Sequence, residues 1–206
     1  VMYDDFAAQL KANPAKVKAW FDKAQEVKRM SDSLYNFADE LKLAIVREAD
    51  GDKADVKNIV GKENLEAANQ VMLAPGRGRG RELFKAINSF RNRILNMITD
   101  PTQRSIISSN LSTDVPRNAK LQGKNWQEYM FESMPVAAAV TLLSKLQSDV
   151  RYAEGEVLHT LVANIDLKDI RVNSLNAFVI PNSQTLVRGD KFSARIVMAA
   201  IDTTQV

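Results

Sequence analysis

The chain of 206 residues contains no cysteine and only one histidine, His159. The absence of thiols excludes cysteine nucleophiles, disulfides, zinc fingers and iron–sulfur clusters, and a single imidazole cannot form a histidine-based metal site by itself. A cysteine-free composition is compatible with a bacterial periplasmic protein, but it does not decide the compartment.

Long hydrophobic runs are also absent. The longest, Val136–Leu143, is far shorter than the ~20 residues that a membrane helix needs. No charged start, apolar stretch and cleavage site opens the chain, so no targeting signal is expected within it. Because the sequence begins at Val1 without an initiator Met, an upstream segment could have been removed, and the location of the protein needs other evidence.

The formal net charge is +3, and the charges are unevenly placed. Between Arg77 and Arg93 six bases stand against one acid, which gives a local charge of +5, whereas the stretch from Asp39 to Glu66 is biased towards acids. Surface regions of opposite sign are therefore expected, although most charge runs are simply solvated faces.

Apolar residues recur at spacings of three and four over three long stretches, which predicts three amphipathic helices. In the first, large and small residues alternate along one seam, with Ser31 as its only polar member. The three sets are Trp20, Ala24, Val27, Ser31, Leu34, Ala38, Leu41, Ile45; Leu83, Ile87, Phe90, Ile94, Met97; and Ala139, Leu143, Leu146, Val150, Ala153, Val157, Leu161, Ile165.

Capping residues and prolines predict the helix boundaries in the segments between these stretches. Asn13-Pro14 and Asp100-Pro101 each combine a capping residue with a proline suited to the first helical turn. A short amphipathic segment is expected before the first pair, at residues 3–11. Residues 53–73 have a weakly helical pattern, and residues 112–125 are predicted to be a loop. The small residues of the first seam suggest that a second copy could pack against it.

The pattern changes near Leu175, where alternation replaces the helical spacing in 177–181, 185–187 and 192–198. We predict a mainly α chain, in which an elongated helical bundle domain (residues 1–172) precedes the first strands of an incomplete, β-sandwich-like domain (residues 173–206). Two or three strands alone cannot bury enough surface for independent stability.

No catalytic residue, cofactor-binding residue or metal ligand is predicted, and the chain is not expected to be an enzyme. His159 has no convergent partner, and many carboxylates have a base three or four residues away, as on solvated helix faces.

The segment from Gly76 to Arg81 alternates glycine and arginine directly before a helix, but it lacks the spacing and the preceding strand of a phosphate-binding loop. Arg77, Arg79 and Arg81 are predicted to form a partner-facing loop, and nucleic acid is not the expected partner. An RNA-binding module that uses this loop stays open as an alternative, as does a helical ligand-sensing ectodomain.

Three stretches, Gly78–Ile87 (GRGRELFKAI), Met134–Val150 (MPVAAAVTLLSKLQSDV) and Arg188–Phe192 (RGDKF), resemble the GldM/PorM family. The resemblance covers most of the chain and is most specific from Met134 to Leu161, followed by Gly189-Asp190 and 199–203. It implies a periplasmic structural component of the type IX secretion and gliding-motility machinery.

The resemblance also implies location and partners. Family members are anchored in the bacterial inner membrane and dimerise, so a homodimer is expected here. A PorL/GldL-like inner-membrane protein would be contacted through a membrane helix, and a PorK/PorN-like outer-membrane ring through C-terminal domains. No cofactor is implied, and the expected role is to link the proton-driven motor to the outer-membrane complex.

Overall fold

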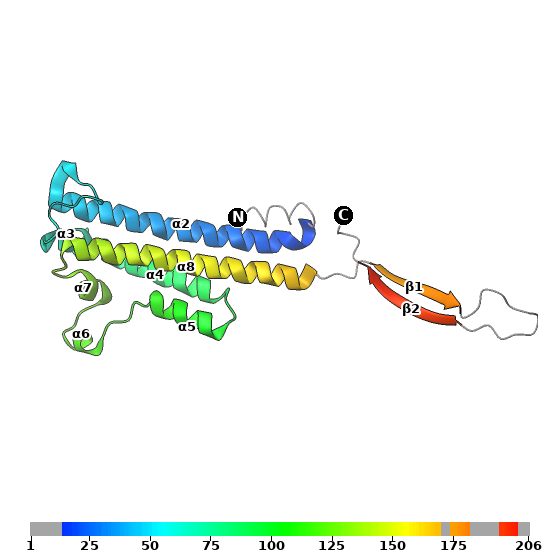
Figure 1. The fold of residues 1–206 in the computed structure, drawn as a ribbon. Coiled ribbons are helices and arrows are strands. Elements are labelled where there is room, and N and C mark those ends of the chain that lie inside the picture. Colours follow the sequence, from blue (N-terminus) through cyan, green and yellow to red (C-terminus); the bar gives the residue numbers. More distant parts are fainter. Residues whose placement is uncertain (1–13, 170–173, 182–193, 202–206) are drawn as a thin grey trace, which may run out of the picture. The chain divides into compact units, whose positions relative to one another are not determined.

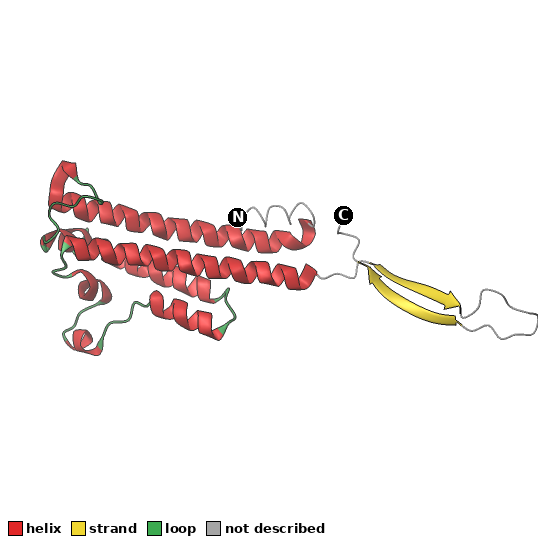
Figure 2. Cartoon of the chain, in the orientation of Figure 1, coloured by secondary structure: helices red, strands yellow, loops and turns green. Residues whose placement is uncertain are grey.

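The computed structural model describes residues 14–169, 174–181 and 194–201. Helices dominate this part of the chain (Figure 2), which confirms the prediction of a mainly α protein. The chain divides into two compact units, Val1–Val162 and Ala163–Val206, and the division falls within the last helix. The predicted domain boundary between residues 172 and 173 stays a prediction.

Two long helices form the frame of the first unit. α2 (Pro14–Asp50) has 37 residues and α8 (Val136–Asp169) has 34, so at 1.5 Å per residue each is roughly 50 Å long. They lie side by side and run in opposite directions (Figure 1). None of the helices that the structure describes is long and apolar enough to cross a membrane.

The predicted apolar seam of α2 faces the core. Every member from Ala24 to Ile45 is buried, and Trp20 is half-buried. Because Ala24, Ser31 and Ala38 are fully covered by the protomer itself, the hypothesis that this seam forms a dimer interface is wrong. A homodimer through another surface stays a prediction.

Five shorter helices and one 3₁₀ turn connect the two long helices. They are η1 (Gly51–Lys53), α3 (Glu66–Met72), α4 (Gly80–Leu95), α5 (Pro101–Asn110), α6 (Arg117–Leu121) and α7 (Trp126–Phe131). α4 buries Leu83, Ile87, Phe90 and Ile94 of the predicted stripe, whereas its last member, Met97, lies beyond the end of the helix and is half-buried. At the start of α5, the side chain of Asp100 accepts a hydrogen bond from the backbone N–H of Gln103 at 2.8 Å, so the cap-plus-proline signature is confirmed.

Two predictions for the connecting segments are wrong. Residues 112–125, predicted as loop, contain the short helix α6, whose run Arg-Asn-Ala-Lys-Leu is mostly good helix formers. Residues 53–73 are α-helical only over α3. In the preceding stretch, Asp55 and Asn64 accept hydrogen bonds from backbone N–H groups two or three residues ahead, and such side-chain contacts favour turns over helix.

The loop between α2 and α3 is tied to both long helices. The carboxylate of Asp50, the last residue of α2, accepts hydrogen bonds from the backbone N–H groups of Val60 at 2.9 Å and Gly61 at 2.7 Å. The backbone carbonyls of Lys62 and Asn64 accept hydrogen bonds from the first N–H groups of α8, at 3.0 and 3.1 Å. These N–H groups have no partner within the helix, so the loop acts as the N-terminal cap of α8.

In the second unit, β1 (Ser174–Pro181) and β2 (Ala194–Ile201) form an antiparallel pair in which Ser174 is opposite Ile201 and Pro181 is opposite Ala194. The predicted change from helix to strand near Leu175 is confirmed. A sandwich stays a prediction, since the described sheet has two strands. The segments predicted at 3–11 and 185–187, and the first two residues of the strand predicted at 192–198, lie outside the described residues.

The first prediction concerns the tie made by Asp50. Replacing Asp50 with Ala removes the acceptor for two backbone N–H groups and loosens the loop that caps α8, so we expect a loss of about 1–2 kcal/mol in the free energy of unfolding. Urea denaturation measures this change. The D52A variant, at an exposed carboxylate in the same turn, is the control and should change stability by less than about 0.5 kcal/mol.

Candidate functional site: a polar network between the two long helices

Of the three arginines predicted to face a partner, Arg77 and Arg79 lie in the connection from α3 to α4 and Arg81 lies in the first turn of α4, and the three differ in their surroundings. Arg77 and Arg81 are exposed, whereas Arg79 is half-buried. The Arg79 guanidinium lies 4.6 Å from the ring centre of Phe37 and pairs with Glu40 of α2 at 3.5 Å and Glu82 of α4 at 3.3 Å. Arg79 therefore contacts its own chain and links two helices.

The glycines of the same segment are required by close packing. A Cβ atom on Gly78 would lie 2.6 Å from the carbonyl oxygen of Met72, and one on Gly80 would lie 2.8 Å from the same oxygen and from Cβ of Gln127. These distances are too short for any residue with a side chain. The Arg-Gly alternation is thus explained by a tight connection against the end of α3, without a nucleotide.

The most extensive set of polar contacts lies between α2 and α8. We call this set the interhelical network. Its residues are Lys28, Ser31, Asp32, Tyr35, Asp39 and Lys42 on α2, and Gln147, Arg151 and Glu154 on α8.

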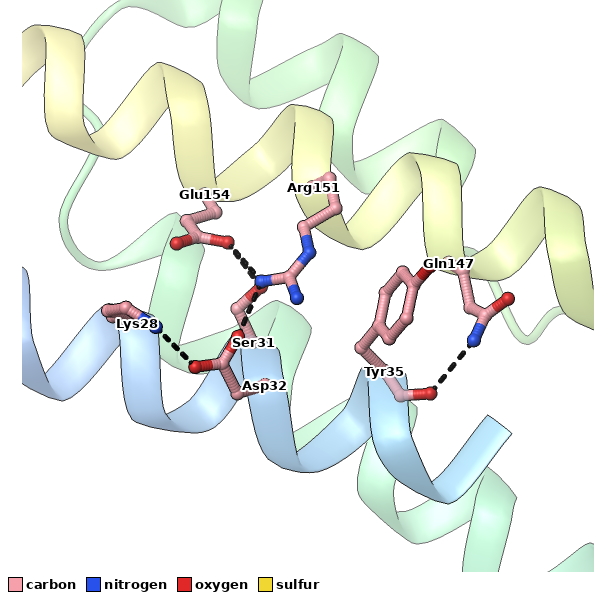
Figure 3. Close-up of polar contacts among 7 residues, drawn as sticks. All are labelled: Lys28, Ser31, Asp32, Tyr35, Gln147, Arg151 and Glu154. Carbon is pink, nitrogen blue, oxygen red and sulfur yellow. Dashed lines mark hydrogen bonds and ion pairs between the residues drawn. The ribbon is translucent and has the colours of Figure 1, made fainter. Parts of the chain in front are cut away.

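Arg151 is the centre of the network (Figure 3). Its Nη1 atom donates to Oε2 of Glu154 at 2.8 Å, to Oγ of Ser31 at 3.1 Å and to Oδ1 of Asp32 at 2.7 Å. Ser31, which is fully buried, donates its hydroxyl to the same Glu154 oxygen at 2.6 Å, and Glu154 itself is 7% exposed. A buried carboxylate thus meets a guanidinium and a hydroxyl, as burial of a charge requires.

Two further interactions of α2 residues support the position of Arg151, one through Asp32 and one directly. Lys28 pairs with the second oxygen of Asp32 at 2.6 Å, so this carboxylate lies between two cations. The guanidinium carbon of Arg151 is 4.5 Å from the ring centre of Tyr35, within range of a cation–π interaction.

A second group of contacts, centred on Gln147, joins the helices nearer the C-terminal end of α2. The side-chain NH₂ of Gln147 donates to the backbone carbonyl of Tyr35 at 2.9 Å and to Oδ1 of Asp39 at 2.7 Å. The side-chain carbonyl of Gln147 accepts from Nζ of Lys42 at 2.5 Å. Lys42 also pairs with Asp39 at 2.9 Å. Gln147 and Lys42 are both buried, and each has partners on the facing helix.

These contacts shift the pKa values of three groups. Lys28, and then Arg151, donate hydrogen bonds that hold the pKa of Asp32 below its usual value against the opposing effect of burial. For Asp39, burial acts to raise the pKa, but hydrogen bonds from Gln147 and Lys42 together outweigh it and the pKa is lowered. Burial likewise acts to lower the pKa of Arg151, and its bonds to Glu154 and Asp32 outweigh that effect and raise it.

Sequence reasoning singled out one member of the network, Ser31, as the polar residue of the α2 seam. It missed the α8 side, where Gln147, Arg151 and Glu154 follow one another at spacings of four and three next to the apolar seam. Polar residues in that spacing share a helix face, so the pattern was available as a signal. Their partners on α2 are more than 100 positions away in sequence, and no local pattern identifies them.

The arrangement is suited to binding two helices together. Its groups are paired with one another between α2 and α8, and the exposed His159 is not among them. Among the described residues, no group of three or more His, Cys, Asp or Glu side chains could hold a metal ion.

The central role of Arg151 can be tested by an Arg151→Met variant. The apolar replacement removes the cation from a carboxylate that is almost fully buried, so we expect a loss of about 2–3 kcal/mol in unfolding free energy. The R93M variant is the matched control, because Arg93 pairs with Glu26 at 2.7 Å in a half-exposed position and its removal should cost less than about 1 kcal/mol. Equal losses in the two variants would contradict the assignment.

The lowered pKa of Asp32 predicts a dependence of stability on pH. A carboxyl group that titrates lower in the folded than in the unfolded chain stabilises the fold above about pH 4, and this contribution is lost as pH falls through the folded value. Because its side chain is 34% exposed, the contribution is about 0.5–1 kcal/mol.

The measurement is the difference in unfolding free energy between pH 6 and pH 3 for the D32N variant and the unmodified chain. D32N should lose less stability on acidification. The D22N variant, which removes a carboxylate from the exposed part of the same helix, controls for the change in net charge. A D32N curve parallel to that of the unmodified chain would exclude the predicted linkage.

Comparison with known proteins agrees with the resemblance seen in the sequence. The family model of the GldM N-terminal domain matches residues 1–164, and the model of the GldM second domain matches residues 166–206. No curated protein matches the chain. The two family matches meet at residue 165, inside α8, in the order of N-terminal and second domain. The chain therefore belongs to the GldM family, whose members are components of gliding motility and type IX secretion.

Proposed function

We propose that this chain is a non-enzymatic coupling component that links the proton-driven inner-membrane motor of the type IX secretion and gliding machinery to the outer-membrane complex. The family assignment supports membership in that machinery. The coupling role is a proposal that rests on how the two long helices are joined.

The observation that carries the proposal is the interhelical network. It ties α2 to α8 at two levels, around Ser31 and around Lys42, which are eleven residues or about 16 Å apart along α2. A slip by one helical turn would move α8 by about 5.4 Å and would separate Arg151 from Asp32 and Gln147 from Lys42. Two helices that cannot slide against each other pass a displacement from one end to the other.

Packing around the network supports the same role. Most described members of the α2 and α8 seams are buried on either side of it, and close-packed interiors have low compressibility. The ion pair between Glu26 and Arg93, at 2.7 Å, adds a link from α2 to α4. The first unit is therefore suited to move as one body.

Location and partners complete the proposal. In it, the chain is the periplasmic region of a protein anchored in the inner membrane, it forms a homodimer, and it acts together with a PorL/GldL-like membrane protein and a PorK/PorN-like ring. The partner-facing role of Arg77 and Arg81 is part of this proposal and is supported by their exposure.

The RNA-binding alternative has less support. It requires the three arginines to be available together, whereas Arg79 pairs with Glu40 and Glu82 and stacks on Phe37. Because these contacts neutralise Arg79, less positive charge is available to bind the phosphate backbone of a nucleic acid.

A secretion and gliding assay in cells that carry the R151M substitution tests the coupling role. We expect secretion and gliding to fall several-fold while the protein remains present, because the loss of the network lets α2 and α8 shift. The control is I98A, which truncates a buried side chain outside the network, at a comparable cost of about 2–4 kcal/mol. I98A should keep near-normal secretion at equal protein level.

Normal secretion and gliding by a folded R151M protein would contradict the proposal. Equal impairment by R151M and I98A would also count against it, since stability alone would then explain the effect.

A further inference from the structure

A small apolar cavity opens at the surface of the first unit, between α4, α7, α8 and the turn that follows α5. Its volume is about 90 Å³. We propose that it binds a small neutral molecule that is mostly hydrocarbon, of about six carbon atoms, with one hydroxyl or carbonyl group. Its inner walls are formed by Leu83, Ile87, Leu111, Trp126, Phe131 and Leu143.

The cavity is preformed and apolar. All six wall residues are buried, and the Trp126 ring is held by aromatic contacts with Phe84 and Phe131, at centre distances of 5.8 and 6.1 Å. Apolar cavities of about 150 Å³ in protein cores stay free of water and bind benzene. A cavity somewhat smaller but open on one side can take a six-carbon ring with its edge at the mouth.

The mouth determines the charge of the ligand. Lys145 and Asp149 lie there but pair with each other at 2.6 Å, so their charges cancel. Asn110 and Ser112 are the other polar residues of the mouth. The Ser112 hydroxyl accepts from the backbone N–H of Asp114 at 3.2 Å and can donate its own hydrogen outward. A charged ligand would have to disrupt the Lys145–Asp149 pair, whereas a neutral one needs only a hydrogen-bonding group.

Cyclohexanol is the probe that fits these requirements, and Trp126 is the reporter. The chain has two tryptophans, so a W20F variant leaves Trp126 as the only one, and excitation selective for tryptophan reports on it alone. Titration with cyclohexanol should give a saturable change in Trp126 fluorescence at millimolar concentrations. Cyclohexylamine and cyclohexanecarboxylate have the same ring with a positive or negative charge, and they should bind at least ten times more weakly.

Filling the cavity tests where the probe binds. Leu146 lines the cavity and is half-buried, so L146F in the W20F background should weaken cyclohexanol binding at least tenfold. The control is L121F, at an exposed leucine of α6 outside the cavity, which should change the affinity by less than twofold. S112F, at the exposed mouth, is the second blocking variant and perturbs the core less.

The proposal is overturned by the absence of a saturable response, by undiminished binding in folded L146F and S112F, or by equal binding of the charged and neutral rings. Thermal melts of each variant, followed by circular dichroism, establish that the compared proteins are folded.

Discussion

Arg151 lies among oxygens from both long helices, and the first unit depends on this one guanidinium being satisfied. Glu154 is almost fully buried, and its contacts with Arg151 and Ser31 offset the cost of burying its charge. Those contacts exist in one register of α2 against α8. Apolar seams alone would permit several registers of similar energy, because leucine and alanine contacts are not directional. The polar residues therefore select the arrangement, and the apolar ones supply most of the stability.

The same division of roles recurs at the end of the bundle. Asp50 and the carbonyls of Lys62 and Asn64 fix a loop that has little apolar burial, and Arg79 joins α2 to α4 above glycines that admit no side chain. In each place a charged or polar group of one element forms hydrogen bonds or ion pairs with the backbone or a side chain of another element. The helix ends and connections are consequently held by specific polar contacts, and this supports the proposal that the first unit acts as a single coupling body.

Periodicity predicted much of this fold. The buried faces of α2 and α4 agree with the spacing of their apolar residues, and Asp100-Pro101 marked the start of α5, because these signals act within one or two turns of chain. The network was largely missed. Gln147 looks like a surface residue when read locally, and only partners more than 100 positions away explain its burial; Arg151 stays 42% exposed, and its contacts with Ser31 and Asp32 are equally distant in sequence. The partner-facing role of the Arg-Gly segment stays a prediction, and the local pattern gives no sign of the Met72 carbonyl that lies too close to Gly78 and Gly80 for any side chain.

The capping of α8 by the loop after α2 has a consequence for how the chain acquires its structure. Ser31 and Glu154 are 123 positions apart, and the cap joins residues near 62 to residues near 136. During synthesis from the N-terminus, the apolar face of α2 is made long before the helix that covers it. Contacts between residues so far apart in sequence form slowly, since closing the intervening chain into a loop costs conformational entropy. The apolar face of α2 in the nascent N-terminal half therefore stays uncovered until α8 is complete.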